Sequence, residues 1–261
     1  MKRFISDIKK HKNYIKYAIS AQLKSEVKGS YLGYLWWLLE PVAFMFIYIF
    51  IAEVVFKARE PYFPIFVFAG YTIFSFFSKN IIKSVKLVAS NKNIVTKVYI
   101  PKFILVIINM GVNFMKMSVS FALILILFIV YWVPVTYYIL YIIPAILLLL
   151  IVTFGFSCLL MHCGVFVTDL AKLVEIGMRL VFYASGVFFL ITTRVPDPWG
   201  EILLKVNPIA LIINSFRNAL LYGIGPELLA MGIWYVVGLA VSWLSVWLIY
   251  RNENTYVKVM N

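Results

Sequence analysis

Residues Glu26 to Met45 read Glu-Val-Lys-Gly-Ser-Tyr-Leu-Gly-Tyr-Leu-Trp-Trp-Leu-Leu-Glu-Pro-Val-Ala-Phe-Met. In this stretch a lysine-rich arm meets a long apolar run through two glycines and a dense group of aromatic side chains. A carboxylate, Glu40, and a proline, Pro41, stand inside the apolar run. Basic residues followed by aromatic and then apolar residues are typical of a chain that enters a membrane from the cytoplasm. The stretch therefore predicts a membrane entry.

The composition of the whole chain agrees with a membrane protein. Of its 261 residues, 63% are hydrophobic and only 13% are charged, and the mean hydropathy is +0.93. Soluble domains are about half apolar and about a quarter charged. Because a spanning helix needs about 20 residues, six spans leave little chain for a soluble domain. We expect an all-α integral membrane protein with an interface segment, 1–33, and a single transmembrane domain, 34–261.

The net charge of +13 is concentrated in two segments. One lies before the first apolar run, and the other extends from Lys79 to Lys102. Positive charge gathered in short loops marks the cytoplasmic side of a membrane protein, so nucleic-acid binding is not expected. The N-terminal segment has no continuous apolar core, which argues against a cleavable signal peptide. The first span is then expected to act as the insertion signal.

Hydropathy and the basic loops together predict six spans. Their expected limits are about 34–56, 63–77, 103–132, 138–167, 173–191 and 229–250. The second span is short and weakly apolar. It is counted because two basic segments, both expected in the cytoplasm, must be separated by two crossings. Six spans place both termini in the cytoplasm, and we expect the protein in the cytoplasmic membrane of a bacterium.

The segment 4–27 alternates apolar and basic residues at helical spacing. This pattern predicts an amphipathic helix lying in the cytoplasmic interface, with its lysines toward the lipid headgroups. The alternative is a solvated arm that only sets the topology. Gly29 and Gly33 follow, and we interpret them as the hinge between this helix and the first span.

The outer loop between the fifth and sixth spans, 198–225, holds two apolar stretches that are each too short to span. Pro198 suits a helix start, and Asn207-Pro208 separates the stretches. We expect two short re-entrant helices before the last span. Such backbone is tolerated in a membrane where it packs against protein or lines a cavity. A pair of helices lying on the surface is the alternative interpretation.

Motifs for catalysis and energy coupling are largely missing from the sequence. It contains no G-x-x-x-x-G-K-[ST] phosphate loop, so we expect no nucleotide cofactor in this chain. Cys158, His162 and Cys163 lie close together, but further ligands for four-coordinate zinc are not near them in the sequence, and no metal site is expected. A disulfide framework is not expected either.

Ionisable groups inside a membrane span are candidate functional residues. The chain has five of them: Glu40, Glu53, Lys116, Glu175 and Arg179. The last two stand at i and i+4 and could pair along one helix. A proton relay through Glu40 or Lys116 is conceivable, and snorkelling or mutual neutralisation near an interface is the structural alternative.

Four aromatic residues, Tyr31, Tyr34, Trp36 and Trp37, are denser than an interfacial belt requires. Flat aromatic faces can also stack on sugar rings. Both interpretations stay open at this point.

Several of these residues also resemble a known family: the membrane subunits of ATP-binding-cassette exporters for O-antigen, capsule and wall teichoic acid. Four landmarks carry the resemblance in order along the chain: the span entry from Tyr31 to Pro41, the lysine-then-proline stretch from Val95 to Lys102, the stretch from Val165 to Leu170, and Asn207-Pro208 followed by Ser215 to Leu221. Members usually carry an Arg-Asp pair in the third landmark. Here Thr168 replaces the arginine.

The resemblance implies a division of labour between subunits. Members work as homodimers with two copies of a separate cytoplasmic P-loop ATPase, which binds ATP and Mg. The segment 84–101 would contain the coupling helix that docks on this ATPase, with Asn91, Lys92, Lys97, Tyr99 and Pro101. The re-entrant pair would be carried by Pro198, Asn207, Pro208 and Arg217.

The implied substrate is a polymer linked to polyprenyl diphosphate. As a hypothesis, Lys24 and Lys28 of the N-terminal helix attract the diphosphate, and the four aromatic residues guide the sugar units. Two other classes stay open. A proton-coupled secondary transporter would use the embedded Glu40 or Lys116, and a polyprenyl-phosphate transferase would need clustered carboxylates for a metal.

Overall fold

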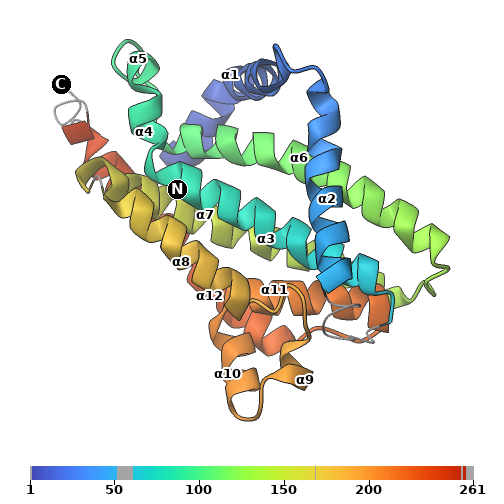
Figure 1. Cartoon of the computed structure of the whole chain (residues 1–261). Coiled ribbons are helices and arrows are strands. Elements are labelled where there is room, and N and C mark those ends of the chain that lie inside the picture. Colours follow the sequence, from blue (N-terminus) through green and yellow to red (C-terminus); the bar gives the residue numbers. More distant parts are fainter. Residues whose placement is uncertain (1, 52–60, 168, 254, 257–261) are drawn as a thin grey trace.

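The computed structural model describes residues 2–51, 61–167, 169–253 and 255–256. Within these ranges all regular secondary structure is helical, as expected. Long helices form a bundle with α1 lying over α6 (Figure 1). The elements are α1 (Lys2–Val27), η1 (Gly33–Leu35), α2 (Trp36–Phe50), α3 (Phe63–Val85), α4 (Leu87–Ser90), α5 (Lys92–Val95), α6 (Phe103–Val130), η3 (Tyr137–Tyr141), α7 (Ile142–Phe166), α8 (Leu170–Ala184), α9 (Ile191–Arg194), α10 (Trp199–Val206), α11 (Pro208–Arg217), η4 (Asn218–Tyr222) and α12 (Leu228–Arg251).

Five helical segments of the described chain are long and apolar enough to cross a membrane. They are Gly33–Phe50, Phe63–Val85, Phe103–Val130, Tyr137–Phe166 and Leu228–Arg251. They match five of the six expected spans. The remaining one, expected over 173–191, corresponds to α8, which has 15 residues and ends at Ala184. Part of the first expected span, including Glu53, lies outside the described residues, as does Thr168.

The helix α3 is the centre of the bundle. Of the most apolar part of this helix, 72% is buried, against 11% for α2, and α3 packs against α2, α6, α7, α8 and α11. It was expected to end near residue 77 but continues to Val85. Asn80 and Ser84, which lower its hydropathy, are buried against protein, so the helix continues past the apolar part that the sequence marked as a span.

The helices α7 and α12 run parallel and touch along most of their length. Near one end the Tyr235 hydroxyl donates to the Pro144 carbonyl at 2.5 Å. In the middle the Ser242 hydroxyl donates to the Ile151 carbonyl at 3.3 Å, and Gly155 has no room for a Cβ beside Ser242. Small residues therefore let the two helix backbones approach closely, as in many membrane proteins.

Candidate functional site

The turn between α1 and α2 has the backbone that its two glycines permit. Gly29 has a φ of +84° and Gly33 a φ of +50°, a left-handed region that glycine occupies without steric cost. The Gly33 amide donates to the Ser30 hydroxyl at 3.3 Å. These angles fit the predicted hinge, and movement about it stays a prediction.

The four aromatic residues after the hinge divide into two pairs. Tyr34 and Trp37 meet edge to face, with ring centroids 4.9 Å apart. Tyr31 and Trp36 are both exposed. The structure thus brings Tyr34 and Trp37 together. Tyr34 nevertheless stays exposed, as do Tyr31 and Trp36.

A carboxylate lies between the two lysines that were predicted to bind a headgroup. Lys24 and Lys28 are exposed near the end of α1. Glu26 instead forms an ion pair with Lys116 of α6, with 2.5 Å between Nζ and Oε2. The embedded Lys116 is therefore paired with the N-terminal helix. Sequence reasoning found this lysine but had no way to name its partner.

A polar cleft of about 70 Å³ lies where α2, α3 and α6 meet. The Lys79 ammonium donates to Glu40 across it, at 2.8 Å, and the Lys116 ammonium lies 5.9 Å from the centroid of the Trp37 ring. The cleft is lined by Trp37, Glu40, Pro41, Tyr71, Thr72, Ser75, Phe76, Lys79, Asn113, Lys116, Met117 and Ser120. Two of the embedded ionisable residues, Glu40 and Lys116, thus open into one space.

A buried amide network supports this cleft. Asn109 and Asn113 stand one turn apart on α6, and each donates through Nδ2 to the Asn80 Oδ1 atom at 2.9 Å. The Asn80 Nδ2 atom donates to the Phe76 carbonyl at 2.7 Å. These hydrogen bonds join α3 to α6. The buried Asn109 Oδ1 atom has no hydrogen-bond partner among the described residues. Sequence reasoning missed the network, although asparagines at i and i+4 inside an apolar span were its visible sign.

Arg217 is buried at the opposite end of α3. Its guanidinium donates to the carbonyl oxygens of Phe66 at 3.0 Å, Gly186 at 2.8 Å and Val187 at 2.5 Å, and it stacks 3.4 Å from the Phe66 ring centroid. Sequence analysis assigned Arg217 to the expected pair of re-entrant helices. The structure gives it a clamping role that joins α11, α3 and the chain after α8.

The Asn207-Pro208 pair begins α11. The Asn207 side chain accepts hydrogen bonds from the amides of Ile209 and Ala210, at 3.0 and 3.3 Å, and Pro208 occupies the first turn, where its missing N–H is not needed. The Asn207 Nδ2 atom also donates to the Ala184 carbonyl at 3.2 Å. This bond satisfies a carbonyl at the end of α8. Pro198 directly precedes α10, as predicted.

The predicted coupling segment forms two short helices, α4 and α5, which project from the bundle beside the two chain ends (Figure 1). Lys92 and Lys97 are exposed on it, whereas Pro101 is buried. Ile94 and Val98 add exposed apolar surface. The Asn91 side chain donates to the Leu87 carbonyl at 2.8 Å and so stabilises the turn between the helices.

Tyr99 connects this segment to both ends of the chain. Its hydroxyl donates to Glu253 at 2.7 Å and accepts from Arg3 at 2.9 Å. Burial, followed by the hydrogen bond to Glu253, raises the pKa of the Tyr99 hydroxyl. Lys102 lies beneath, 3% exposed, and burial lowers the pKa of its ammonium group. The start of α1, the predicted coupling segment and the end of α12 therefore form one charged cluster.

Other candidate residues lie apart from these sites. Glu175 and Arg179 are both exposed on α8 and form no ion pair among those of the described residues, so the pairing suggested by their spacing is not seen. The attraction between two exposed charges along a helix is weak. His162 interacts with the Tyr256 hydroxyl through Nδ1 at 2.5 Å. Within the described chain no group of three potential metal ligands occurs.

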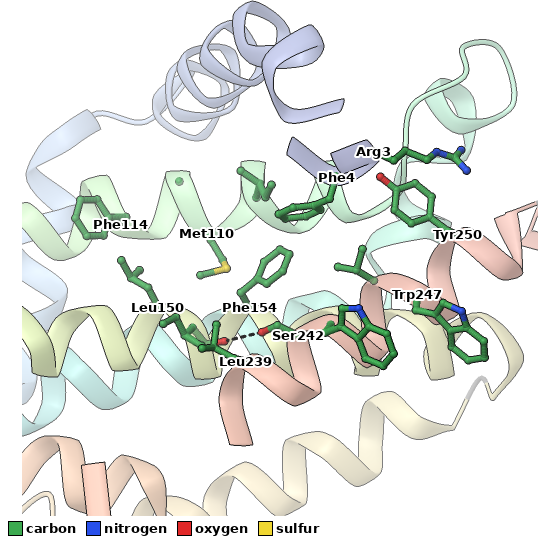
Figure 2. Close-up of a pocket in the computed structure, with 15 residues that line it drawn as sticks. Arg3, Phe4, Met110, Phe114, Leu150, Phe154, Leu239, Ser242, Trp247 and Tyr250 are labelled. Carbon is green, nitrogen blue, oxygen red and sulfur yellow. Dashed lines mark hydrogen bonds between the residues drawn. The ribbon is translucent and has the colours of Figure 1, made fainter. Parts of the chain in front are cut away.

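An apolar groove of about 710 Å³ runs between α6, α7 and α12, below the start of α1 (Figure 2). Phe114, Leu150 and Trp247 are among its lining residues, and Arg3 lies at one rim. Because its walls belong to candidate spans, the groove is on the surface that would face lipid chains. It lies apart from the polar cleft.

The helical fold, with its apolar spans and its charged cluster at one end, defines a multi-pass membrane protein. Three known permeases are similar to it. The O-antigen export system permease protein RfbA of Myxococcus xanthus is 25% identical over 217 residues, which are 83% of this chain and 84% of that protein. Two proteins of the same name from Klebsiella pneumoniae are 27% identical over 202 and 203 residues, 77% of this chain and 77% and 78% of theirs.

No model of a protein family matches the chain. The three similarities nevertheless cover most of its length, and they confirm the resemblance to permease subunits of polysaccharide exporters.

Proposed function

We propose that this chain is the permease half of an ATP-driven exporter that moves a polysaccharide linked to polyprenyl diphosphate across the bacterial cytoplasmic membrane. The similarity to O-antigen export permeases over 77–83% of the chain carries the proposal. It favours O-antigen over capsule and wall teichoic acid as the polymer.

In this proposal α8 is also a crossing, the fifth of six in chain order. It begins beside the end of α7, on the side where His162 meets Tyr256, and it ends beside Asn207. At about 1.5 Å per residue its 15 residues cover roughly 22 Å, and the chain after Ala184 completes the crossing. With six crossings both termini are cytoplasmic. This agrees with the contact between Arg3 and Glu253 near the two ends, 3.7 Å apart.

The helices α10 and α11 are then the re-entrant pair on the outer side. Three observations support this placement. The helices are short, the apolar face of α11 is buried, and Arg217 ties α11 to the outer end of α3. Backbone at membrane depth is stable where it packs against protein in this way.

Two copies of the chain would form the export path. The helices α2 and α8 expose large apolar side chains, among them Phe46, Phe50, Leu180 and Tyr183. Contact between two copies through these faces would place both sets of aromatic residues near the path. Two copies of a P-loop ATPase, with bound ATP and Mg, would dock on the projecting α4–α5 segment.

The test is reconstitution with its ATPase. The permease should co-purify with a P-loop ATPase encoded beside it, and a lipid-linked glycan should stimulate ATP hydrolysis in proteoliposomes. A panel of O-antigen, capsular and teichoic acid precursors would identify the polymer. Export that persists without ATP and follows a pH gradient would contradict the proposal in favour of a secondary transporter. Turnover of a polyprenyl phosphate by the chain alone would indicate a transferase.

A further inference from the structure

We propose that the polar cleft between α2, α3 and α6 is a binding site for a phosphoryl group. Glu26 and Glu40 form ion pairs with its lysines until the phosphoryl group displaces them. This inference deepens the proposed function and rests on it. The site differs from the exposed Lys24 and Lys28, which sequence analysis selected for the headgroup.

The cleft gathers positive charge where a membrane protein rarely places it. Lys79 and Lys83 stand one turn apart on α3, and Lys116 lies on α6. Lys83 interacts electrostatically with both Glu26 and Lys116. Lys79, Lys116 and Glu40 line the cleft. Lys83 and Glu26 lie beside it, so three ammonium groups and two carboxylates leave an excess of one positive charge. Ionisable groups inside a span are costly and usually mark a binding or transport site.

Both carboxylates are held in a way that allows exchange. The side chains of Lys79 and Glu40 are 44% and 46% exposed, and those of Lys116 and Glu26 are 24% and 30% exposed. Lys79 and Lys116 each have one carboxylate partner among the ion pairs of the described residues. A phosphoryl group carries more negative charge than a carboxylate and offers more acceptor oxygens, so it competes well for both ammonium groups.

An unsatisfied hydroxyl also points to a ligand. Thr72 lines the cleft and is 4% exposed, and its Oγ1 atom has no hydrogen-bond partner among the described residues. Buried polar atoms are normally paired. A phosphoryl oxygen in the cleft would accept a hydrogen bond from this hydroxyl.

Displacement of Glu26 from the site would also affect how α1 is held. Its ion pair with Lys116 attaches the end of α1 to α6, directly before the two positive-φ glycines. When a phosphoryl group binds Lys116 and displaces Glu26, α1 loses this attachment. Arrival of a headgroup would then release the N-terminal helix at the hinge.

The test compares the two members of each ion pair. Replacing either the lysine or the glutamate by glutamine breaks the same ion pair, but only the first removes a group that would bind the phosphoryl group. The purified full chain in phosphatidylcholine vesicles would be titrated with radiolabelled farnesyl diphosphate. We expect Lys116→Gln and Lys79→Gln to weaken binding by about tenfold, and Glu26→Gln and Glu40→Gln to tighten it several-fold. A purely structural role for the pairs would move both members in the same direction, and that result would overturn the inference.

The exposed pair Lys205 and Glu201 on α10, 3.0 Å apart, is the matched control. Lys205→Gln and Glu201→Gln should leave binding of farnesyl diphosphate unchanged. If they change binding as much as the cleft variants do, the effect comes from general surface charge and not from the cleft. Inorganic pyrophosphate should compete with farnesyl diphosphate, because the phosphoryl chemistry is shared. If phosphatidylglycerol competes equally well, the cleft binds membrane lipid and the inference fails.

The proposed export function is tested separately from the cleft. The same variants would be tested for ATPase stimulation by lipid-linked glycan in the complex with the partner subunit. Stimulation that persists while the opposed effects on binding are absent rejects the cleft alone. Loss of both ATP dependence and glycan stimulation in the unmodified complex rejects the exporter.

Discussion

Glu26 at the end of α1 and Lys116 within α6 form an ion pair of 2.5 Å that connects the N-terminal helix to a membrane span. The two residues are far apart in the sequence, and each was visible there only as a charge in an unusual place. Their contact makes the junction of α1, α2, α3 and α6 the chemically richest part of the described chain.

The first prediction concerns the strength of this pair. Glu26→Gln and Lys116→Gln should each lower stability in detergent by about 1 kcal/mol, because the pair is only partly shielded from solvent. A double-mutant cycle on the thermal midpoint measures the coupling. Additive effects of the two substitutions would indicate that the pair contributes nothing, although both residues could still bind a ligand.

The second prediction concerns Arg217. Arg217→Lys should lower the free energy of unfolding by about 2–4 kcal/mol, because one ammonium group cannot reproduce three carbonyl contacts made by a planar guanidinium. The exposed Arg194 offers the matched control, since Arg194→Lys should cost little. Equal thermal midpoints for the two variants would contradict the clamp.

Gly70 gives an independent test of the same clamp. A Cβ on Gly70 would overlap the Arg217 guanidinium, so Gly70→Ala should destabilise the protein by about 1–3 kcal/mol. On α8, Gly177 faces open space, and Gly177→Ala should be neutral or stabilise by up to about 1 kcal/mol through helix propensity. Thermal unfolding of both variants in one detergent decides this prediction. If Gly70→Ala were as stable as Gly177→Ala, the packing around Arg217 would be looser than described.

We expect two substitutions of Asn207 to lower the stability of the protein by different amounts. Asn207→Ser keeps an oxygen that can cap α11 but loses the donor to Ala184, whereas Asn207→Ala loses both functions. We expect the alanine variant to lose about 1–2 kcal/mol and the serine variant to lose less. Protease sensitivity of the 185–207 stretch, measured together with the thermal midpoint, should follow the same order. A serine variant as unstable as the alanine variant would place the whole effect on the bond to Ala184.

Helix limits were largely predictable because they follow hydrophobic periodicity. The span expected over 103–132 is α6, which ends at Val130, and Asn207-Pro208 separates α10 from α11 as its cap chemistry implies. Contacts between distant segments were not predictable. The end of α8 depends on Asn207, which follows it by more than 20 residues, and the hydrogen bonds of Asn80 come from residues on another helix. Such partners are set by packing, which local patterns do not encode.

The last prediction uses the buried Lys102. Burial lowers the pKa of its ammonium group, and Glu253 partly opposes this effect. Because the pKa in the folded state is below the unfolded value, the unfolded chain holds the proton more tightly. The resulting loss of stability is complete below the folded-state pKa, and it disappears as the pH rises toward the ordinary lysine value of about 10.4.

Lys102→Met should therefore raise the thermal midpoint at pH 7, and its advantage should shrink as the pH approaches 10. Lys97→Met, which removes an exposed lysine from the same segment, is the control. The thermal midpoint of Lys102→Met is compared with that of Lys97→Met, so that effects common to both variants cancel. A Lys102→Met protein less stable than the parent at pH 7 would mean that the contacts of Lys102 with Glu253 and Tyr99 outweigh the cost of burying its charge.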